Sequence, residues 1–280
     1  MTEFYVYDVF SKARFGGNQL AVIPNAITLP EADLQAIARE FNFSETTFVY
    51  PPTDAANTAR VRIFTPTMEV PFAGHPTLGT AIALADHGAG PDIVLELGVG
   101  PIACRAANGA AEFTTTAALE ITSSPDCDTV ADALGISANQ IKTDVHAPTM
   151  ASLGLAFTIT ELQTRADLAA CVPNVAGFRR GMAAYPSSLD FAQFAYVRQS
   201  DDLIHARMFA PLDNIPEDPA TGSACATLAA LLAQLTGVEV KFEVHQGFDM
   251  GRPSIISLST NGTNVTVAGH AVHVMTGKLL

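Results

Sequence analysis

The chain has 280 residues, of which 48% are hydrophobic and 15% charged. That much apolar material predicts a folded protein with a substantial core, and the length favours two domains at about 100 to 200 residues each. A formal net charge of −13 would repel the phosphate backbone of a nucleic acid, so nucleic-acid binding is not expected.

Short strand patterns alternate with helix patterns through the first half of the chain. The chain opens on a strand pattern with no secretory signal before it, so we expect a cytoplasmic protein. A Gly-His-Pro turn then opens a helix of small residues. The predicted strands cover residues 4–10, 20–23, 41–50 and 59–65, the predicted helices cover 30–40 and 76–86, and hairpin strands fill 92–122.

A connector rich in Ser, Pro and Asp, residues 122–128, separates this half from the second. The longest near-apolar stretch, residues 224–233, falls well short of the roughly 20 residues needed to cross a membrane. We therefore predict soluble domains over residues 1–120 and 121–270. In the second half the predicted helices cover residues 131–134, 165–171 and 219–235, the last closed by Gly237, and the predicted strands cover 157–162, 191–197 and 205–209.

An internal repeat supports two domains of similar structure. The segment Arg62-Ile63-Phe64-Thr65-Pro66 is echoed by Arg207-Met208-Phe209-Ala210-Pro211. In the same order, the segment of residues 75–81 aligns with that of residues 218–224, each with a polar residue, a Pro and the start of a helix of small residues. Two matches at near-equal spacing favour duplication of one supersecondary unit.

The polar residues before these prolines, His75 and Asp218, are candidate N-cap residues. Unpaired N–H groups at two helix starts, facing each other across a domain cleft, would hold a small carboxylate. For Asp218 a plain N-cap is the simpler interpretation. His75 caps helices poorly, so a chemical role is as well supported for it as a structural one.

Glu45 is the third candidate. In the predicted strand of residues 41–49 it shares a face with phenylalanine, threonine and valine side chains. Burial on a partly apolar face would favour a protonated carboxyl, which is a good general acid or base near neutral pH. A solvated edge position, or a Glu that caps the turn at Ser44, explains the same pattern.

Other common motifs are not supported. Residues 98–103 have the spacing of a dinucleotide-binding loop, but strands rather than a helix follow, so a hairpin turn is expected. The histidines do not cluster, and no metal site is expected. The four cysteines match no metal, redox or disulfide pattern and are expected to be reduced thiols: Cys104, Cys127, Cys171 and Cys225.

Several motifs together strongly resemble the PhzF-like family, the phenazine-biosynthesis isomerases built on the diaminopimelate epimerase fold. They run in the expected order over nearly the whole chain, at residues 15–22, 44–49, 72–79, 217–224, 246–247 and 250–254. The resemblance implies an α+β fold of two pseudo-symmetric domains, each a curled, mostly antiparallel, barrel-like sheet around a central helix. It also implies that a C-terminal strand, about residues 270–280, completes the first domain, that the active site lies in the cleft between the domains, and that the protein is a homodimer.

The same resemblance implies a cofactor-independent isomerase acting on a small carboxylate-bearing substrate. Glu45 would take a proton from one carbon and return it to another, with His75 and Asp218 as polar catalytic partners. The residues implied to contact the substrate are Asn18, Gly74, Gly222 and Ser223. The paired cysteines of the related epimerases are missing from both helix starts, so two-thiol racemisation is unsupported, and Cys225, inside its helix, is interpreted as a buried structural thiol.

Two other functions remain open from the sequence. A non-catalytic protein of this fold would bind a small carboxylate without needing Glu45. An epimerase or lyase would carry out different chemistry at the same site. Members of one fold family need not share a substrate, so the phenazine precursor is only one candidate.

Overall fold

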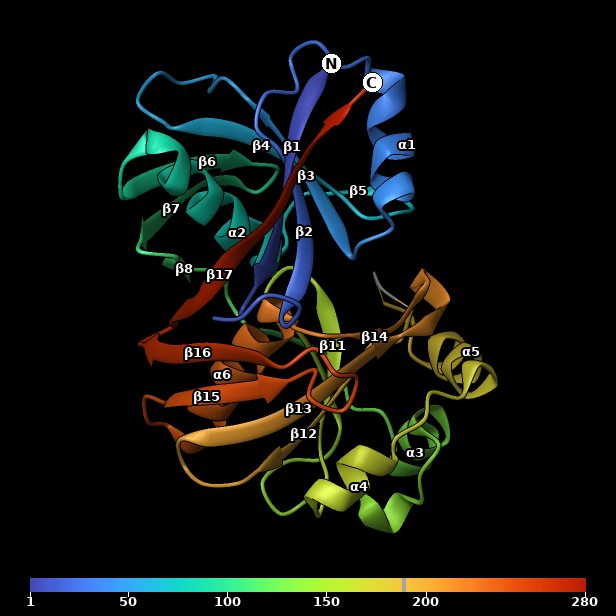
Figure 1. The fold of residues 1–280 in the computed structure, drawn as a ribbon. Coiled ribbons are helices and arrows are strands. Elements are labelled where there is room, and N and C mark those ends of the chain that lie inside the picture. The colour runs from blue at the N-terminus through green and yellow to red at the C-terminus, as the bar shows by residue number, and fades with distance from the viewer. Residues whose placement is uncertain (188–189) are drawn as a thin grey trace. The chain divides into compact units, whose positions relative to one another are not determined.

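A computed structural model describes residues 1–187 and 190–280 (Figure 1). The chain divides into two units. Unit 1 comprises Met1–Thr115 and Thr266–Leu280, and unit 2 comprises Thr116–Val265.

Most strands of unit 1 lie before residue 116, and its last strand comes from the C-terminal end of the chain. Its elements are β1 (Thr2–Val9), β2 (Asn18–Ile23), α1 (Glu31–Phe41), β3 (Glu45–Tyr50), β4 (Ala59–Phe64), β5 (Glu69–Val70), α2 (Gly74–Leu84), the π-helical turn η1 (Ala85–Ala89), β6 (Asp92–Leu97), β7 (Gly100–Ala107), β8 (Ala110–Thr115) and most of β17 (Asn264–Leu279).

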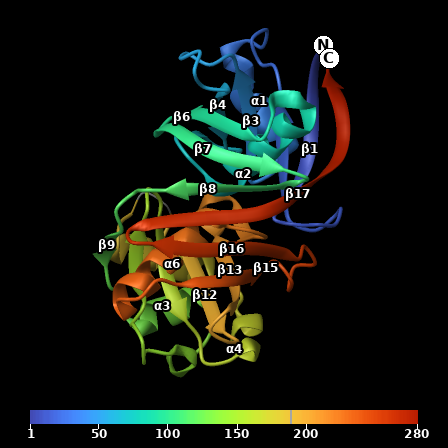
Figure 2. The same ribbon diagram turned by 90° about the vertical axis from the view of Figure 1, so that its left-hand side faces the viewer.

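The strands of unit 1 pair in a closed circuit. The order is β17-β1-β2-β3-β4-β6-β7-β8, and β8 pairs with β17 again. The pairs β2–β3 and β4–β6 are parallel and the other pairs with a determined register are antiparallel. Thr2 lies opposite Leu279, so the two ends of the chain lie side by side (Figures 1 and 2). A closed sheet of this kind leaves no long unpaired edge.

Helix α2 fills the inside of this barrel. It contacts β1, β2, β3, β6, β7 and β8, and Gly74 to Ala83 are all buried. Small residues make this possible: a Cβ added to Gly79 would lie 2.6 Å from side-chain carbons of both Val9 and Leu20. Helix α1 is amphipathic and packs outside, where Leu34 and Ala38 are buried with a small cluster that includes Phe48.

Unit 2 repeats the arrangement and adds helices. Its elements are β9 (Glu120–Ser123), α3 (Cys127–Leu134), the 3₁₀ turn η2 (Ala138–Gln140), β10 (Thr149–Ser152), β11 (Ala156–Glu161), α4 (Arg165–Ala170), α5 (Val175–Ala184), β12 (Gln193–Arg198), β13 (Leu203–Ala210), the 3₁₀ turn η3 (Pro211–Asp213), β14 (Ile215–Asp218), α6 (Gly222–Thr236), β15 (Lys241–Gln246) and β16 (Ser254–Asn261).

Six strands of unit 2 pair in the same order as the six unit 1 strands β1-β2-β3-β4-β6-β7. In β10-β11-β12-β13-β15-β16, the pairs β11–β12 and β13–β15 are parallel, as β2–β3 and β4–β6 are in unit 1. Arg62 lies over the ring of Phe64, and Arg207 lies over that of Phe209 in the same way. Helix α6, which is mostly buried from Gly222 to Leu232 and exposed over its last turn, packs on β10, β11 and β16. The predicted fold, two pseudo-symmetric curled sheets each around a central helix, is confirmed.

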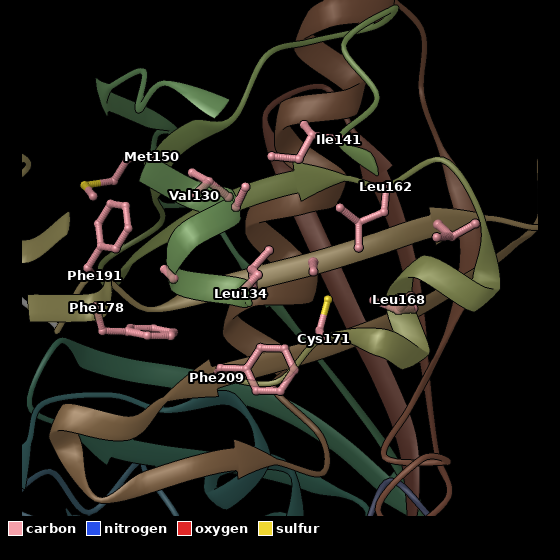
Figure 3. Close-up of a cluster of buried hydrophobic side chains, with 14 of the residues drawn as sticks. Val130, Leu134, Ile141, Met150, Leu162, Leu168, Cys171, Phe178, Phe191 and Phe209 are labelled. Atoms are coloured by element: carbon pink, nitrogen blue, oxygen red, sulfur yellow. The ribbon is translucent and has the colours of Figure 1, made fainter. Parts of the chain in front are cut away.

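A second hydrophobic core lies under α3, α4 and α5 (Figure 3). Phe178 of α5 and Phe191 meet edge to face, with ring centroids 6.5 Å apart. Gly181 allows this approach, because a Cβ there would lie 2.2 Å from the Phe191 ring. Among the described residues, no helix combines the length and apolar character needed to span a membrane.

The predicted elements are found with shifted ends. The strand expected from residue 41 begins only at Glu45, because α1 continues to Phe41 and ends at Asn42, which has a left-handed backbone with φ of 52°. The long helix expected from residue 219 begins at Gly222 and is closed by Gly237, as predicted. Leu97 pairs with Gly100, which confirms the predicted hairpin; its turn is residues 98–99, and residues 100–103 already belong to β7.

Candidate active site

Four of the predicted site residues lie together in unit 1. Asn18 begins β2 and Glu45 begins β3, and these parallel strands are neighbours, with Leu20 opposite Glu45. Gly74 and His75 form the first turn of the central helix α2. Because that helix starts inside the barrel, its first turn is brought against the starts of both strands.

Within this cluster, the side chains of His75 and Glu45 are in direct contact. Nδ1 of His75 lies 3.1 Å from Oε2 of Glu45, and the two side chains are 4% and 16% exposed. The other ring nitrogen, Nε2, lies 3.3 Å from the backbone carbonyl oxygen of Gln19. The imidazole is therefore held between a carboxyl group and a backbone acceptor.

The protonation state of His75 follows from these contacts. Burial lowers its pKa to about 3, with the hydrogen bond to Gln19 acting in the opposite direction, so the ring is neutral near pH 7. A carbonyl oxygen can only accept a hydrogen bond, which assigns the single ring proton to Nε2. Nδ1 then presents a lone pair to Glu45. That lone pair can accept a hydrogen bond from the Glu45 carboxyl whenever the carboxyl carries a proton.

The predicted N-cap roles of His75 and Asp218 are wrong. The N-cap of α2 is Ala73, whose carbonyl already accepts from the N–H of Thr77, so His75 lies inside the helix. Asp218 ends β14, and three residues separate it from the first residue of α6, whose N-cap is Thr221. The His75 ring instead contacts Glu45 and the Gln19 carbonyl, and the Asp218 carboxylate accepts from the hydroxyl of the N-cap residue Thr221.

Unit 2 carries its own cluster, which contains Asp218, Gly222 and Ser223. Asp218 is buried, and the hydroxyl of Thr221 donates to its Oδ2 at 2.6 Å. Gly222 and Ser223 form the first turn of α6, directly after Thr221. The cluster thus combines a buried carboxylate with the start of the central helix.

The side chain of Gln246, at the end of β15, completes this cluster. Its Oε1 accepts from the N–H of Thr221 at 3.1 Å, and its Nε2 donates to the Asp218 carbonyl at 2.8 Å and to the Thr221 hydroxyl at 3.0 Å. The sequence reasoning assigned no role to Thr221 or Gln246. One signal was present: Phe242, Val244 and Gln246 alternate on the buried face of β15, where a polar side chain is unexpected.

Arg207 secures the strand that carries Asp218. Its guanidinium makes two hydrogen bonds of 2.8 Å to the carboxylate of Glu217, next to Asp218. Its Nη1 donates to three backbone carbonyls at and just beyond the end of α4, those of Leu168, Ala169 and Cys171. A buried guanidinium is stabilised by such complete pairing.

The cysteines do not contribute a nucleophile to this cluster. Cys225 is fully buried, and burial, followed by the nearby charge of Asp218, raises the pKa of its thiol well above the usual range. The protonated thiol donates to Oε1 of Gln246, with Sγ 3.9 Å from that oxygen, and is a poor nucleophile. Within the described part of the chain, no three His, Cys, Asp or Glu side chains are grouped so as to hold a metal ion.

Solved structures of similar proteins define the fold class. The chain superposes with a TM-score of 0.87 on a PhzF-family phenazine biosynthesis protein of Bacillus anthracis, covering 100% of this chain and 99% of that one at 22% identity. A probable proline racemase of Agrobacterium radiobacter gives a TM-score of 0.67 over 100% of this chain and 93% of that one, at 12% identity. These likenesses establish the epimerase-like fold.

Sequence comparisons identify the family. Residues 7–277 match the PhzC-PhzF family of phenazine biosynthesis-like proteins. An uncharacterised isomerase of Mesorhizobium japonicum is 38% identical, covering 99% of this chain and 98% of its own. The trans-2,3-dihydro-3-hydroxyanthranilate isomerase of Pseudomonas chlororaphis is 33% identical over 100% of both chains. The chain belongs to the PhzF-like family and is an isomerase.

Proposed function

We propose that the protein is a cofactor-independent isomerase that moves a proton on a small carboxylate-bearing substrate, with Glu45 as general acid and base. The observation that carries this proposal is the contact of Glu45 with the Nδ1 atom of a neutral, buried His75. A carboxylate that takes a proton from carbon needs a neighbour that accommodates the protonated form. The Nδ1 lone pair does this, because it accepts the hydrogen bond that the new carboxylic acid can donate.

The proposed reaction has two steps. Glu45, as a carboxylate, removes a proton from a carbon next to an unsaturated or carboxylated group, and the electron pair of that C–H bond becomes part of a conjugated double bond. Glu45, now a carboxylic acid, delivers the proton to a different carbon, whose π electrons form the new C–H bond. The double bond moves and no atom is gained or lost. Asp218 orients or polarises the substrate.

The substrate class rests on the relatives. Several curated relatives that are 32% to 33% identical, all from Pseudomonas species, are trans-2,3-dihydro-3-hydroxyanthranilate isomerases. That compound carries a carboxylate and a ring double bond, as the proposed chemistry requires. The negative charge fits the starts of α2 and α6, neither of which has a side-chain cap.

The test is deuterium incorporation from heavy water into a panel of small unsaturated and chiral carboxylates that includes this compound. Wild type is compared with Glu45→Gln, and the matched control is Glu69→Gln, which removes a carboxylate that pairs with Arg62 in the same unit. We expect exchange in wild type and the control and none in Glu45→Gln. Exchange that survives Glu45→Gln would end the assignment, and binding without exchange in wild type would favour a carboxylate-binding protein.

A further inference from the structure

The amide side chain of Gln246 spans the loop that joins β14 to α6. It is 1% exposed, and its oxygen and both of its N–H groups are directed to this loop. The partners in the loop are the N–H and the hydroxyl of Thr221 and the carbonyl of Asp218, and the amide oxygen also accepts from the thiol of Cys225 in α6, at 3.9 Å. One side chain on a neighbouring strand therefore ties both ends of the loop together.

These hydrogen bonds also fix the direction of the contact between Thr221 and Asp218. The Thr221 hydroxyl accepts from Nε2 of Gln246 at 3.0 Å, so its own proton is left to donate to Oδ2 of Asp218 at 2.6 Å. The order of donation is Gln246 to Thr221 to Asp218. The orientation of the Asp218 carboxylate thus depends on a residue that does not contact it directly.

The backbone after Gln246 lies equally close to the loop. Gly247 has φ of +76°, and a Cβ there would lie 2.7 Å from the carbonyl oxygen of Pro219 and 2.3 Å from that of Arg252. Only glycine combines this left-handed conformation with such an approach. Strand β15 therefore ends directly against the loop.

The internal repeat shows that the barrel itself does not need a polar residue here. In unit 2, His205 lies two residues before Arg207 and pairs with His245 of β15. In unit 1, Arg60 lies two residues before Arg62 and pairs with Glu96 of β6, so His245 and Glu96 are equivalent. The counterpart of Gln246 is therefore Leu97, and Gly98, which lies against Pro71, is the counterpart of Gly247. Leu97 is buried at the same place in the fold. An apolar side chain suffices in unit 1, because the loop that joins β5 to α2 there carries no carboxylate to orient.

We propose that Gln246 is a positioning residue for Asp218, holding the loop from Asp218 to Thr221 in the geometry that catalysis requires. The inference rests on the proposed function for its catalytic consequence, whereas the ordering of the loop can be measured independently of turnover. The substitution that isolates the role is Gln246→Leu, because the fold already accommodates leucine at the equivalent position in unit 1.

The first experiment compares wild type, Gln246→Leu and Gln140→Leu. Gln140 lies in the same unit, and its amide also makes side-chain hydrogen bonds, to the N–H of Ser137 and to Asp167, away from Asp218. We expect Gln246→Leu to fold with a lower melting temperature, because the Thr221 N–H and the Asp218 carbonyl lose their partner. We also expect it to lower kcat at least tenfold with a smaller effect on KM, and to speed hydrogen exchange at the Thr221 amide. Gln140→Leu should leave both kcat and that exchange rate unchanged.

A second variant, Gln246→Glu, gives a readout that a purely structural role would not produce. A protonated Glu at this position keeps one donor for the loop, whereas its carboxylate would face the Asp218 carbonyl and keeps none. We expect its activity to rise as the pH falls, relative to the wild-type profile. Unchanged amide exchange in Gln246→Leu overturns the inference whether or not a substrate is known. If turnover needs Glu45 but Gln246→Leu keeps the wild-type kcat, the positioning role of Gln246 is overturned and the proposed function stands.

Discussion

His75 presents the Nδ1 lone pair of a neutral ring to Glu45, so the two side chains do not form an ion pair. Nδ1 of His75 lies 3.1 Å from Oε2 of Glu45, and the ring proton is held on Nε2 by the Gln19 carbonyl. A neutral imidazole in this orientation accepts hydrogen bonds from the carboxyl group and cannot donate to it. This arrangement suits a carboxyl group that gains and loses a proton during each turnover.

The first prediction is that His75 stays neutral, with its proton on Nε2, between pH 5 and 9. The reason is burial, which lowers the pKa of the ring to about 3. Nitrogen chemical shifts of the ring, assigned by comparison with His75→Gln, report both the charge and the tautomer. A ring that titrates near pH 6.5, the ordinary value, would contradict the assigned state.

The same pKa predicts a pH-dependent contribution to stability. The folded pKa of His75 lies below the unfolded value of 6.5, so the unfolded chain binds a proton that the folded chain does not. The free energy of unfolding should therefore fall by about 1.4 kcal/mol for each pH unit as pH drops from 6.5 towards 3. Urea unfolding of wild type and His75→Gln across this range measures the difference. Parallel pH curves for the two proteins would refute the prediction.

A third prediction compares the two equivalent arginines, Arg207 and Arg62. Replacing Arg207 by Met removes the donor to Glu217, whose side chain is only 16% exposed, and to three backbone carbonyls, of which that of Leu168 keeps the N–H of Cys171. We expect a loss of about 3 to 5 kcal/mol in the free energy of unfolding. Arg62→Met should cost about 1 kcal/mol or less, because its partners Glu31 and Glu69 are 74% and 42% exposed and regain water. Equal losses of stability in the two variants would show that burial does not distinguish the contributions of Arg207 and Arg62.

The fold was predictable because its signals are local and occur twice. Alternating strands and helices of small residues are read from short windows, and the repeat around Arg62 and Arg207 defined two similar units. The strand error at residues 41–44 has a specific cause. Phe41 and Phe43 alternate like strand residues, yet Phe41 ends a helix and packs edge to face on Phe4, with ring centroids 5.0 Å apart. Tertiary packing, invisible in the local pattern, decided the conformation.

The candidate site was predictable only in part. The local pattern and the family resemblance predicted Glu45 and His75 as site residues. Their contact, however, depends on the parallel pairing of β2 with β3 and on where α2 begins. Gln246 reaches Asp218 from a different strand, and no local rule links the two. Sequence proposed the chemical groups, whereas the hydrogen-bond partners that orient them required the folded chain.

The last prediction concerns Asp190, a buried carboxyl outside both clusters. Burial, followed by the charge of Asp213, raises its pKa to about 7, against opposing hydrogen bonds from the N–H groups of Leu212 and Asp213. The folded pKa lies above the unfolded value of 3.8, so its contribution to stability is present at low pH and lost as pH rises from about 3.8 to 7. The loss is at most about 1.4 kcal/mol for each pH unit.

Asp190→Asn removes this titration and keeps a carbonyl oxygen that can accept from the same two N–H groups. We expect the variant to be more stable than wild type at pH 8 and to approach wild type at pH 4, with the exposed Asp201→Asn as control. The wild-type curve alone cannot test this, because His75 and Asp190 act in opposite directions between pH 3.8 and 6.5. Only the difference between variant and wild type in urea unfolding isolates each group. If the difference in the free energy of unfolding between Asp190→Asn and wild type stays constant from pH 4 to 8, the pKa of Asp190 is not raised by folding.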